Sequence, residues 1–454
     1  MLGALLTMVA AASPVDGLPV DAPDRSQPPP VVAPTPWALP EISASRSGDG
    51  YRVQHVELSG ASDVEYRILF HVPGGANDPA SRIAVDLWTA ETVLSPPGWL
   101  DLVLDDLSMA VDSYSAGDAV VVSAVGLRTL VLPTVDVLEE IVYLPRYRRA
   151  HIRQAVREAV RSMTKDTSPS FRADEALRWA WDDPSRGRSI EPRDWRRVKR
   201  KDVLARHEAW RRSRVTVLVV GEVPDPLLEH IGEVLDPAAP LDTEGTLPEA
   251  EDRQARMIGV DLPGSTQAAI RLRTAAPRRG SVEDASMRVL DITLGQGFGS
   301  VIHSTLVGDL GLAYDVWASH QRAAVSPHWT IQTSVRPQDA AEALQTIQRI
   351  LEDVAKDGID DIRRRGAWAT STRLWNESVE SPYMAGQFYE DLALAGESVA
   401  TAEGQLAEIG RVTSEQLSEV AGAYLLSGQL WVVCGDRGVL GPQLAAAGFV
   451  VDWQ

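Results

Sequence analysis

The fold is decided by a run of apolar and β-branched residues, Val215-Thr216-Val217-Leu218-Val219-Val220, which ends in Gly221-Glu222. A continuous apolar run of this length predicts a buried strand. A second run of the same kind, Leu430-Trp431-Val432-Val433-Cys434, ends in Gly435-Asp436, and the two glycine–acid pairs lie 214 residues apart. Each run closes a segment with the same order of expected elements, so the sequence predicts internal duplication of an α+β unit.

On either side of these two runs, the spacing of apolar residues predicts the remaining helices and strands of each half. In the first half we expect strands at 51–58, 65–72 and 119–126, and helices at 79–94, 131–143, 148–163 and 174–181. In the second half we expect strands at 257–260, 267–274, 313–320 and 329–335, and helices at 282–294 and 337–354. Thr413 and Gln416 have the spacing of a capping box before a further helix. The predicted fold class is α+β, with two homologous α/β-sandwich-like halves.

Composition excludes several classes of protein. The chain has 454 residues, a net charge of −19 and one cysteine. A disulfide scaffold is therefore excluded, and an acidic chain lacks the clustered Lys and Arg that bind a phosphate backbone, so no nucleic-acid partner is predicted. Cys434 lies inside an apolar run, which indicates a small buried hydrophobic residue rather than a nucleophile.

The predicted organisation begins with an export segment. Residues 1–16 contain an apolar run with a small-residue exit, as in a secretory signal, although the basic residues that usually precede such a run are missing; the alternative is an apolar tail. This run is too short to span a bilayer, so no integral membrane segment is predicted, and the expected location is periplasmic or secreted. Further predicted segments are a proline-rich tether (17–50), an N-terminal half (51–223), a linker (224–256) and a C-terminal half (257–454).

Two motifs in the second half carry a family resemblance. The run Leu294-Gly295-Gln296-Gly297-Phe298-Gly299-Ser300-Val301-Ile302 is followed by Gly311-Leu312-Ala313-Tyr314-Asp315-Val316. Together they resemble the second-domain signature of the insulinase-like (pitrilysin, M16) zinc peptidases. Supporting stretches at 261–267 and 357–362 extend the resemblance over roughly residues 51–440. The resemblance implies homologous halves that close like a clamshell around an unfolded peptide.

The catalytic motif of that family is missing from this chain. Active members resemble one another in an inverted zinc motif, His-x-x-Glu-His, on the first long helix, where two imidazoles bind zinc and the Glu polarises water. The corresponding stretch here, 82–93, contains no histidine, and Glu91 has no imidazole partner. One carboxylate cannot hold zinc at the affinity a hydrolase needs. We therefore predict no catalytic residue, no metal ligand and no cofactor.

Two other residues could be taken for metal ligands, and each has a simpler interpretation as an ordinary helix residue. Glu158 lies near the place of the family's third ligand, and without the His pair we expect a solvated helix carboxylate. His207-Glu208-Ala209-Trp210-Arg211 resembles a forward zinc motif, but Arg211 stands where the second His is required. Because the surrounding stretch is strongly basic, we expect His207 to be a surface residue.

The candidate substrate-binding residues are Tyr314, Gly297, Phe298 and Gly299. The resemblance implies that these glycines form a loop beside the substrate chamber, where small residues let a peptide backbone approach. Active members carry an Arg seven residues before the Tyr, and this position is Val307. The Tyr314 hydroxyl could bond a peptide carbonyl, or it could simply face water at a strand edge. A dinucleotide loop is rejected because the glycines follow a helix rather than a strand.

These observations favour a catalytically silent M16-like subunit. Its expected partners are a homologous zinc-bearing subunit, or a second copy of itself, and an unfolded peptide that adds as an edge strand. Two alternatives stay open at this stage. One is an active zinc metalloendopeptidase with unorthodox ligands, and the other is an exported scaffold without a peptidase role.

Overall fold

Two six-stranded sheets form the framework of the described chain. The computed structural model describes residues 35–47, 51–72, 78–96, 98–116, 119–165, 168–182, 190–235, 254–297, 299–322 and 326–454. The strand order in the first sheet is β1 (Ile42–Ser47), β2 (Tyr51–Val56), β6 (Val215–Val220), β3 (Asp63–His71), β5 (Ala119–Leu127) and β4 (Ala110–Ala116). The order in the second sheet is β12 (Val451–Trp453), β7 (Arg256–Asp261), β11 (Leu430–Gly435), β8 (Ala268–Ala275), β10 (His328–Val335) and β9 (Ala313–Gln321).

The register of the two sheets confirms the predicted duplication. In the first sheet, β6 runs parallel to β2 and antiparallel to β3, and Arg67 lies opposite Leu218. In the second sheet, β11 runs parallel to β7 and antiparallel to β8, and Arg271 lies opposite Val432. Leu218 and Val432 are 214 residues apart, the same spacing as the two glycine–acid pairs. The predicted fold class of two homologous α+β halves is therefore confirmed.

Helices cover the sheets. The helices of the first half are α1 (Pro79–Asp86), α2 (Trp99–Asp106), α3 (Val131–Tyr143), α4 (Arg149–Lys165), α5 (Pro169–Asp182), α6 (Pro192–Arg196), α7 (Arg200–Arg211) and α8 (Asp225–Val234). Those of the second half are α9 (Asp284–Gly295), α10 (Val301–His303), α11 (Ala340–Asp357), α12 (Asp361–Glu377), α13 (Pro382–Ala395), α14 (Val399–Ile409), α15 (Ser414–Val420) and α16 (Arg437–Ala446). The capping box predicted from Thr413 and Gln416 opens α15.

Each sheet buries one face under helices of its own half. On β3, Val64, Tyr66 and Ile68 share one apolar core with residues of α1, α3, α7 and α8. On β8, Ile270 and Leu272 share another with residues of α9, α11 and α15. Successive side chains of a strand point to opposite faces of the sheet, so every second residue of β3 and of β8 faces the core of its own half.

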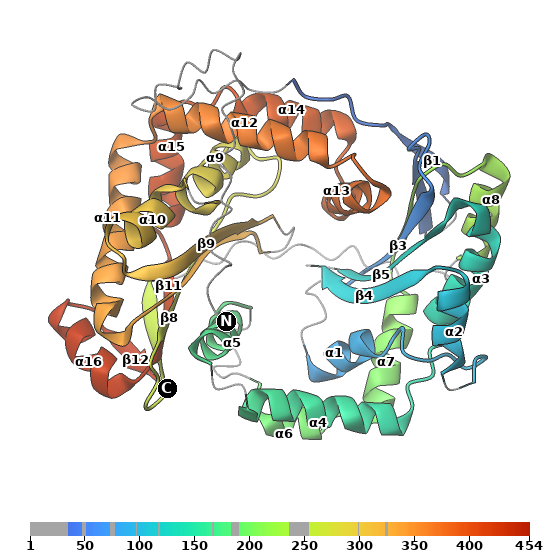
Figure 1. Cartoon of the computed structure of the whole chain (residues 1–454), viewed down its shortest axis with the longest axis horizontal. Helices are drawn as coiled ribbons and strands as arrows, with labels where there is room; N and C mark the ends of the chain where they lie inside the picture. Colours follow the sequence, from blue (N-terminus) through green and yellow to red (C-terminus); the bar gives the residue numbers. More distant parts are fainter. Residues whose placement is uncertain are drawn as a thin grey trace, which may run out of the picture. The chain divides into compact units, whose positions relative to one another are not determined.

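The opposite face of each sheet is covered by a helix from the other half. Helix α13 packs on β3 and β6 of the first sheet, and α5 packs on β8 and β11 of the second, as can be followed in Figure 1. The two helices have the same length, and each begins with proline after a serine, at Ser168-Pro169 and Ser381-Pro382, 213 residues apart. They are therefore equivalent elements of the duplicated unit, exchanged between the halves.

Several elements differ from the sequence prediction, which did not include α2, β4 or β12. The helix expected at 79–94 ends at Asp86, because the following turns insert Trp88 into the core and leave Val93 and Leu94 exposed. Strand β1 lies inside the predicted tether, and α8 lies inside the predicted linker. Ordered structure therefore reaches further into both segments than we expected. Residues 1–16, most of the tether and residues 236–253 of the linker lie outside the described residues.

Candidate functional site

An aromatic cluster occupies the segment that the family resemblance aligns with the zinc helix. Trp88 follows α1 and is fully buried. Its ring stacks on Trp210 at 5.3 Å between centroids and meets the edge of His207 at 5.0 Å. The indole Nε1 donates a hydrogen bond to the carbonyl of Ile141 at 3.2 Å. Trp88 is therefore a core residue whose polar atom is satisfied, and the space it fills is closed to solvent.

The prediction that His207 is a surface residue is wrong. Its side chain is only 5% exposed, and Nε2 lies 3.0 Å from the carbonyl oxygen of Val142. Because a carbonyl oxygen only accepts, Nε2 carries the proton. Burial lowers the pKa of His207 to about 4, so the ring is neutral near pH 7. The basic residues of α7 lie on its other faces, which is why the composition of the stretch was misleading.

Among the described residues, neither candidate carboxylate of the first half belongs to a group of side chains that could hold a metal ion. Glu91 is buried and forms an ion pair with Arg148, whose Nε lies 2.5 Å from Oε2. Glu158 is exposed on α4 and accepts a hydrogen bond from Gln154, as expected of a solvated helix carboxylate. Within the described ranges, no three His, Cys, Asp or Glu side chains come close enough together to hold a metal ion.

The glycine-rich segment of the second half starts from a closely packed helix end. Gly295, the last residue of α9, lies so near β9 that a Cβ there would come within 2.0 Å of the Cβ of Ala318. The next residue, Gln296, donates to the buried carboxylate of Asp291 at 2.5 Å. These two contacts fix where the loop begins. Beyond them, Gly297 and Gly299 are exposed, while Phe298 lies outside the described residues.

Tyr314 lies on the edge strand of the second sheet. Strand β9 is the last strand in that sheet, and the Tyr314 side chain is 95% exposed. Trp317, three residues further along the strand, is about half exposed. Val307, which stands at the position of the family's Arg, is partly buried in the π-helical turn Ser304–Asp309. The loop that starts at Gly295 and the exposed Tyr314 therefore adjoin the same edge strand.

The two exchanged helices are each held by a buried arginine that the sequence analysis missed. On the first sheet, Arg67 donates from Nη1 to Glu390 of α13 at 2.5 Å and from Nε to Glu65 at 3.1 Å. Tyr114 of β4 donates to the same Glu390 oxygen at 2.6 Å. Burial raises the pKa of Glu65 to about 7, with the charge of Arg67 opposing that shift. Burial also raises the pKa of Glu390.

The equivalent contact on the second sheet is simpler. Arg271 donates from Nε to Asp174 of α5 at 2.5 Å and from Nη1 to the carbonyl oxygens of Ile270 and Thr333 at 3.0 and 3.1 Å. The Asp174 side chain is 43% exposed. The recurrence of Ser-Pro at 168–169 and 381–382 was a sequence signal that these two helices are equivalent.

Comparison with protein families supports the family resemblance. Residues 197–363 match the family model described as the peptidase M16 inactive domain. Over this segment the chain is similar to M16 proteins. The matched segment runs from the end of the first half into α12, and includes both the glycine-rich segment and Tyr314. The matched residues do not include the stretch 82–93, where the zinc motif was expected. No match was found among curated proteins.

Solved structures of M16 proteins share the fold of this chain. A peptidase M16 inactive domain from Pseudomonas fluorescens has a TM-score of 0.77 and 16% identity, covering 87% of this chain and 98% of that one. A protease from Helicobacter pylori gives 0.76 and 16%, covering 87% and 100%. The periplasmic protease PqqL from Escherichia coli gives 0.71 and 12%, covering 90% of this chain and 47% of that chain. At these identities the likeness establishes the fold alone.

Proposed function

We propose that this chain is a non-catalytic M16-like subunit that pairs with a zinc-bearing homologue and helps to enclose an extended peptide. The observation that carries the proposal is the buried Trp88 cluster in the segment that the family resemblance aligns with the zinc helix. A metal centre needs side-chain ligands around an open position. Here that segment contributes an indole, and the nearby His207 is neutral and bonded to a carbonyl.

Peptide binding is assigned to the outer edge of the second sheet. An edge strand offers unpaired backbone groups, so an extended peptide can add to it with little demand on sequence. Tyr314 projects from β9, and its hydroxyl can donate to a peptide carbonyl. We propose that Gly297, Phe298 and Gly299 border the same peptide, since small residues allow close approach. The net charge of −19 favours basic peptides.

Metal analysis and cleavage assays test the non-catalytic assignment. The purified chain should contain no stoichiometric zinc and should not cleave unfolded peptides on its own. One equivalent of zinc, with cleavage that a chelator abolishes, would instead establish an active metallopeptidase with unorthodox ligands.

Co-purification tests the pairing. The tagged chain, expressed in its native cell, should recover a homologue with an intact His-x-x-Glu-His motif, and the pair should cleave peptides that neither chain cleaves alone. Recovery of the chain alone, with no gain of cleavage when the homologue is added, would favour an exported scaffold.

Substitutions at Tyr314 test the peptide site. Tyr314→Phe removes only the hydroxyl, and Tyr314→Ala also removes the ring. We expect both to weaken binding of a basic unfolded peptide, with the Ala variant weaker, because ring and hydroxyl both contact the peptide. Trp99→Ala, at an exposed aromatic residue of α2 in the first half, is the matched control. Equal affinities of all four proteins, wild type included, would remove Tyr314 from the site.

We further propose that the protein is exported, with residues 1–16 as its signal and halves at 51–223 and 257–454. The apolar run near the start supports this, as does the fold shared with a periplasmic protease. Among the described residues, no helix is long and apolar enough to cross a membrane. Mass spectrometry of the protein purified from its native cell tests the signal, because cleavage would move the N-terminus to near residue 17.

A further inference from the structure

A small cavity of about 150 Å³ lies among helices of the second half, next to the end of β9. The charged side chains that line it are three arginines and one aspartate: Arg279, Arg288, Arg322 and Asp284. Much of the remaining wall is apolar and comes from α12, α13 and α14, including Trp375, Phe388 and Leu406. The cavity therefore combines several arginine side chains with a hydrophobic wall.

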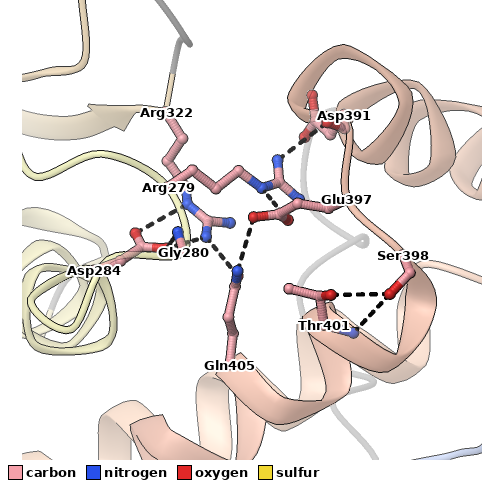
Figure 2. A network of polar contacts seen from close by, with 9 residues as sticks. All are labelled: Arg279, Gly280, Asp284, Arg322, Asp391, Glu397, Ser398, Thr401 and Gln405. Carbon is pink, nitrogen blue, oxygen red and sulfur yellow. Dashed lines mark hydrogen bonds and ion pairs between the residues drawn. The ribbon is translucent and has the colours of Figure 1, made fainter.

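Two of the arginines are held in a network of polar contacts. Figure 2 shows Arg322 directed at Asp284 and Gln405, with Nε donating to Asp284 at 3.2 Å and Nη2 to Gln405 at 2.8 Å. Arg279 donates from Nε to Glu397 at 2.6 Å. Gln405 in turn donates to the second oxygen of Glu397 at 2.8 Å. These contacts hold the guanidinium groups of Arg279 and Arg322 at the cavity wall and occupy the acceptor atoms of Asp284, Glu397 and Gln405.

Arg288 is the arginine without such contacts. Among the described residues it forms no hydrogen bond or ion pair, and its side chain is partly buried. The acids one turn away on its own helix are occupied by other donors. Asp284 accepts from Arg322 and from the backbone of Gly280, and Asp291 accepts from Trp329 and Gln296. Burial, followed by the charge of Arg322, lowers the pKa of Arg288.

A second polar group at the cavity also lacks a partner. Ser371 of α12 lines the cavity and is only 3% exposed, and its hydroxyl is buried without a hydrogen-bond partner in the described chain. A buried hydroxyl that makes no hydrogen bond costs free energy, and a partly buried guanidinium without a hydrogen-bond partner is unfavourable beside the charge of Arg322. One acceptor group with negative charge would satisfy both.

We propose that this cavity is a binding site for a small carboxylate with a short apolar tail. The carboxylate oxygens accept from the Arg288 guanidinium and the Ser371 hydroxyl, and the tail packs against Trp375, Phe388 and Leu406. The volume suits a group of about the size of a branched short-chain acid. The same chemistry is presented by a free acid and by the C-terminal carboxylate of a peptide that ends in an apolar residue. The site is separate from the edge-strand peptide site proposed above.

Calorimetry with isovalerate as the probe and isovaleramide as its neutral analogue tests the site in the full chain. We expect isovalerate to bind, and the amide to bind at least tenfold more weakly because it lacks the charge. Arg288→Gln should weaken isovalerate binding by about tenfold to a hundredfold, and Ser371→Ala by about threefold to tenfold. Arg373→Gln, an exposed residue of α12 paired with Glu377, is the control and should bind like wild type.

Thermal melts separate a ligand site from a structural role. Without probe, Arg288→Gln should melt close to the wild-type temperature, because the variant loses a charge that is repelled by Arg322 and attracted by Asp284 and Asp291. Saturating isovalerate should raise the melting temperature of wild type and of Arg373→Gln, but not that of Arg288→Gln. Absence of isovalerate binding to wild type, equal binding of acid and amide, or a marked fall in the melting temperature of Arg288→Gln without probe would each overturn the proposal.

A blocked peptide distinguishes the two sources of carboxylate. A tripeptide that ends in leucine with a free carboxylate should compete with isovalerate if the natural ligand is a peptide end, and the same tripeptide with an amidated end should not. If neither peptide competes while isovalerate binds, the site takes free small acids.

Discussion

In each half, an arginine at the equivalent strand position holds the exchanged helix, but the residues around the two arginines differ. Arg67 and Arg271 occupy equivalent positions, opposite Leu218 and Val432. Arg67 is enclosed with two buried carboxylates and a tyrosine hydroxyl, whereas Arg271 has one carboxylate that is nearly half exposed. Duplication thus preserved the location of the charge, while its partners diverged. A buried network is costly to break, so the two contacts differ in how much stability depends on them.

Removing each arginine should give the largest effect and the clearest difference. Arg67→Met keeps the bulk but leaves Glu65 and Glu390 buried without their cation, so we expect a loss of about 3–5 kcal/mol in the free energy of unfolding at pH 7. Arg271→Met should cost about 1–2 kcal/mol, because water reaches Asp174. Urea denaturation measures both. Equal losses of unfolding free energy in the two variants would show that the second carboxylate beside Arg67 does not affect stability.

The packing of the two helices differs at one equivalent position, Gly386 of α13 and Ala173 of α5. A Cβ at Gly386 would lie 2.7 Å from Nε of Arg67 and 2.8 Å from Cγ of Glu65. We therefore expect Gly386→Ala to lower the free energy of unfolding by about 1–3 kcal/mol despite the better helix propensity of alanine. The reverse change, Ala173→Gly, should cost about 1 kcal/mol through propensity. A stabilising Gly386→Ala would contradict the close approach of α13 to the ion pair.

Glu65 should make the first contact dependent on pH. Its pKa is about 7 in the folded protein and 4.5 in an unfolded chain, so the folded state binds the proton more tightly. Stability from this group is present below about pH 4.5 and is lost as the pH rises to about 7. We expect wild type to lose stability relative to Glu65→Gln across that window.

Comparison of the two proteins isolates Glu65 from the buried histidines. The pKa values of His71 and His207 are lowered to about 4 by burial, so both add stability as the pH rises from about 4 to 6.5. Because both proteins contain these histidines, their contributions cancel in the difference. Urea denaturation at several pH values measures the difference in the free energy of unfolding between wild type and Glu65→Gln. A difference that does not vary between pH 4.5 and 7 would be evidence against the raised pKa of Glu65.

The smallest effects are expected at the glycine–acid pairs. Glu222 accepts from the backbone of Gly60 at 3.0 Å, and Asp436 accepts from the backbone of the equivalent Gly264 at 2.8 Å. Asp436 also caps α16 by accepting from Gly438. We expect Glu222→Ala and Asp436→Ala each to lower the melting temperature slightly, with the larger decrease for Asp436→Ala because it loses two backbone contacts. The opposite order would show that the cap contributes little.

Local patterns predicted the sheets well and the first helix poorly. The runs at 215–220 and 430–434 were identified because a buried strand needs consecutive apolar residues whatever covers it. The helix expected at 79–94 was too long because Trp88 and the residues after it keep an apolar pattern after the helical hydrogen bonds have ended. For the candidate site, the sequence showed that residues 82–93 contain no histidine, but it could not predict that Trp88 packs against Trp210 and His207.

The sequence by itself determined the duplicated α+β plan, the missing zinc ligands and the burial of Cys434, whose side chain is fully enclosed. These features depend on spacing along the chain and on residue types. Only the tertiary structure decided that α5 and α13 cross to the opposite sheets, that His207 is buried, and that Arg288 and Ser371 line one cavity. Each of these depends on side chains brought together from distant segments, and the free energy of burying a polar group is set by those neighbours rather than by the residues beside it in sequence.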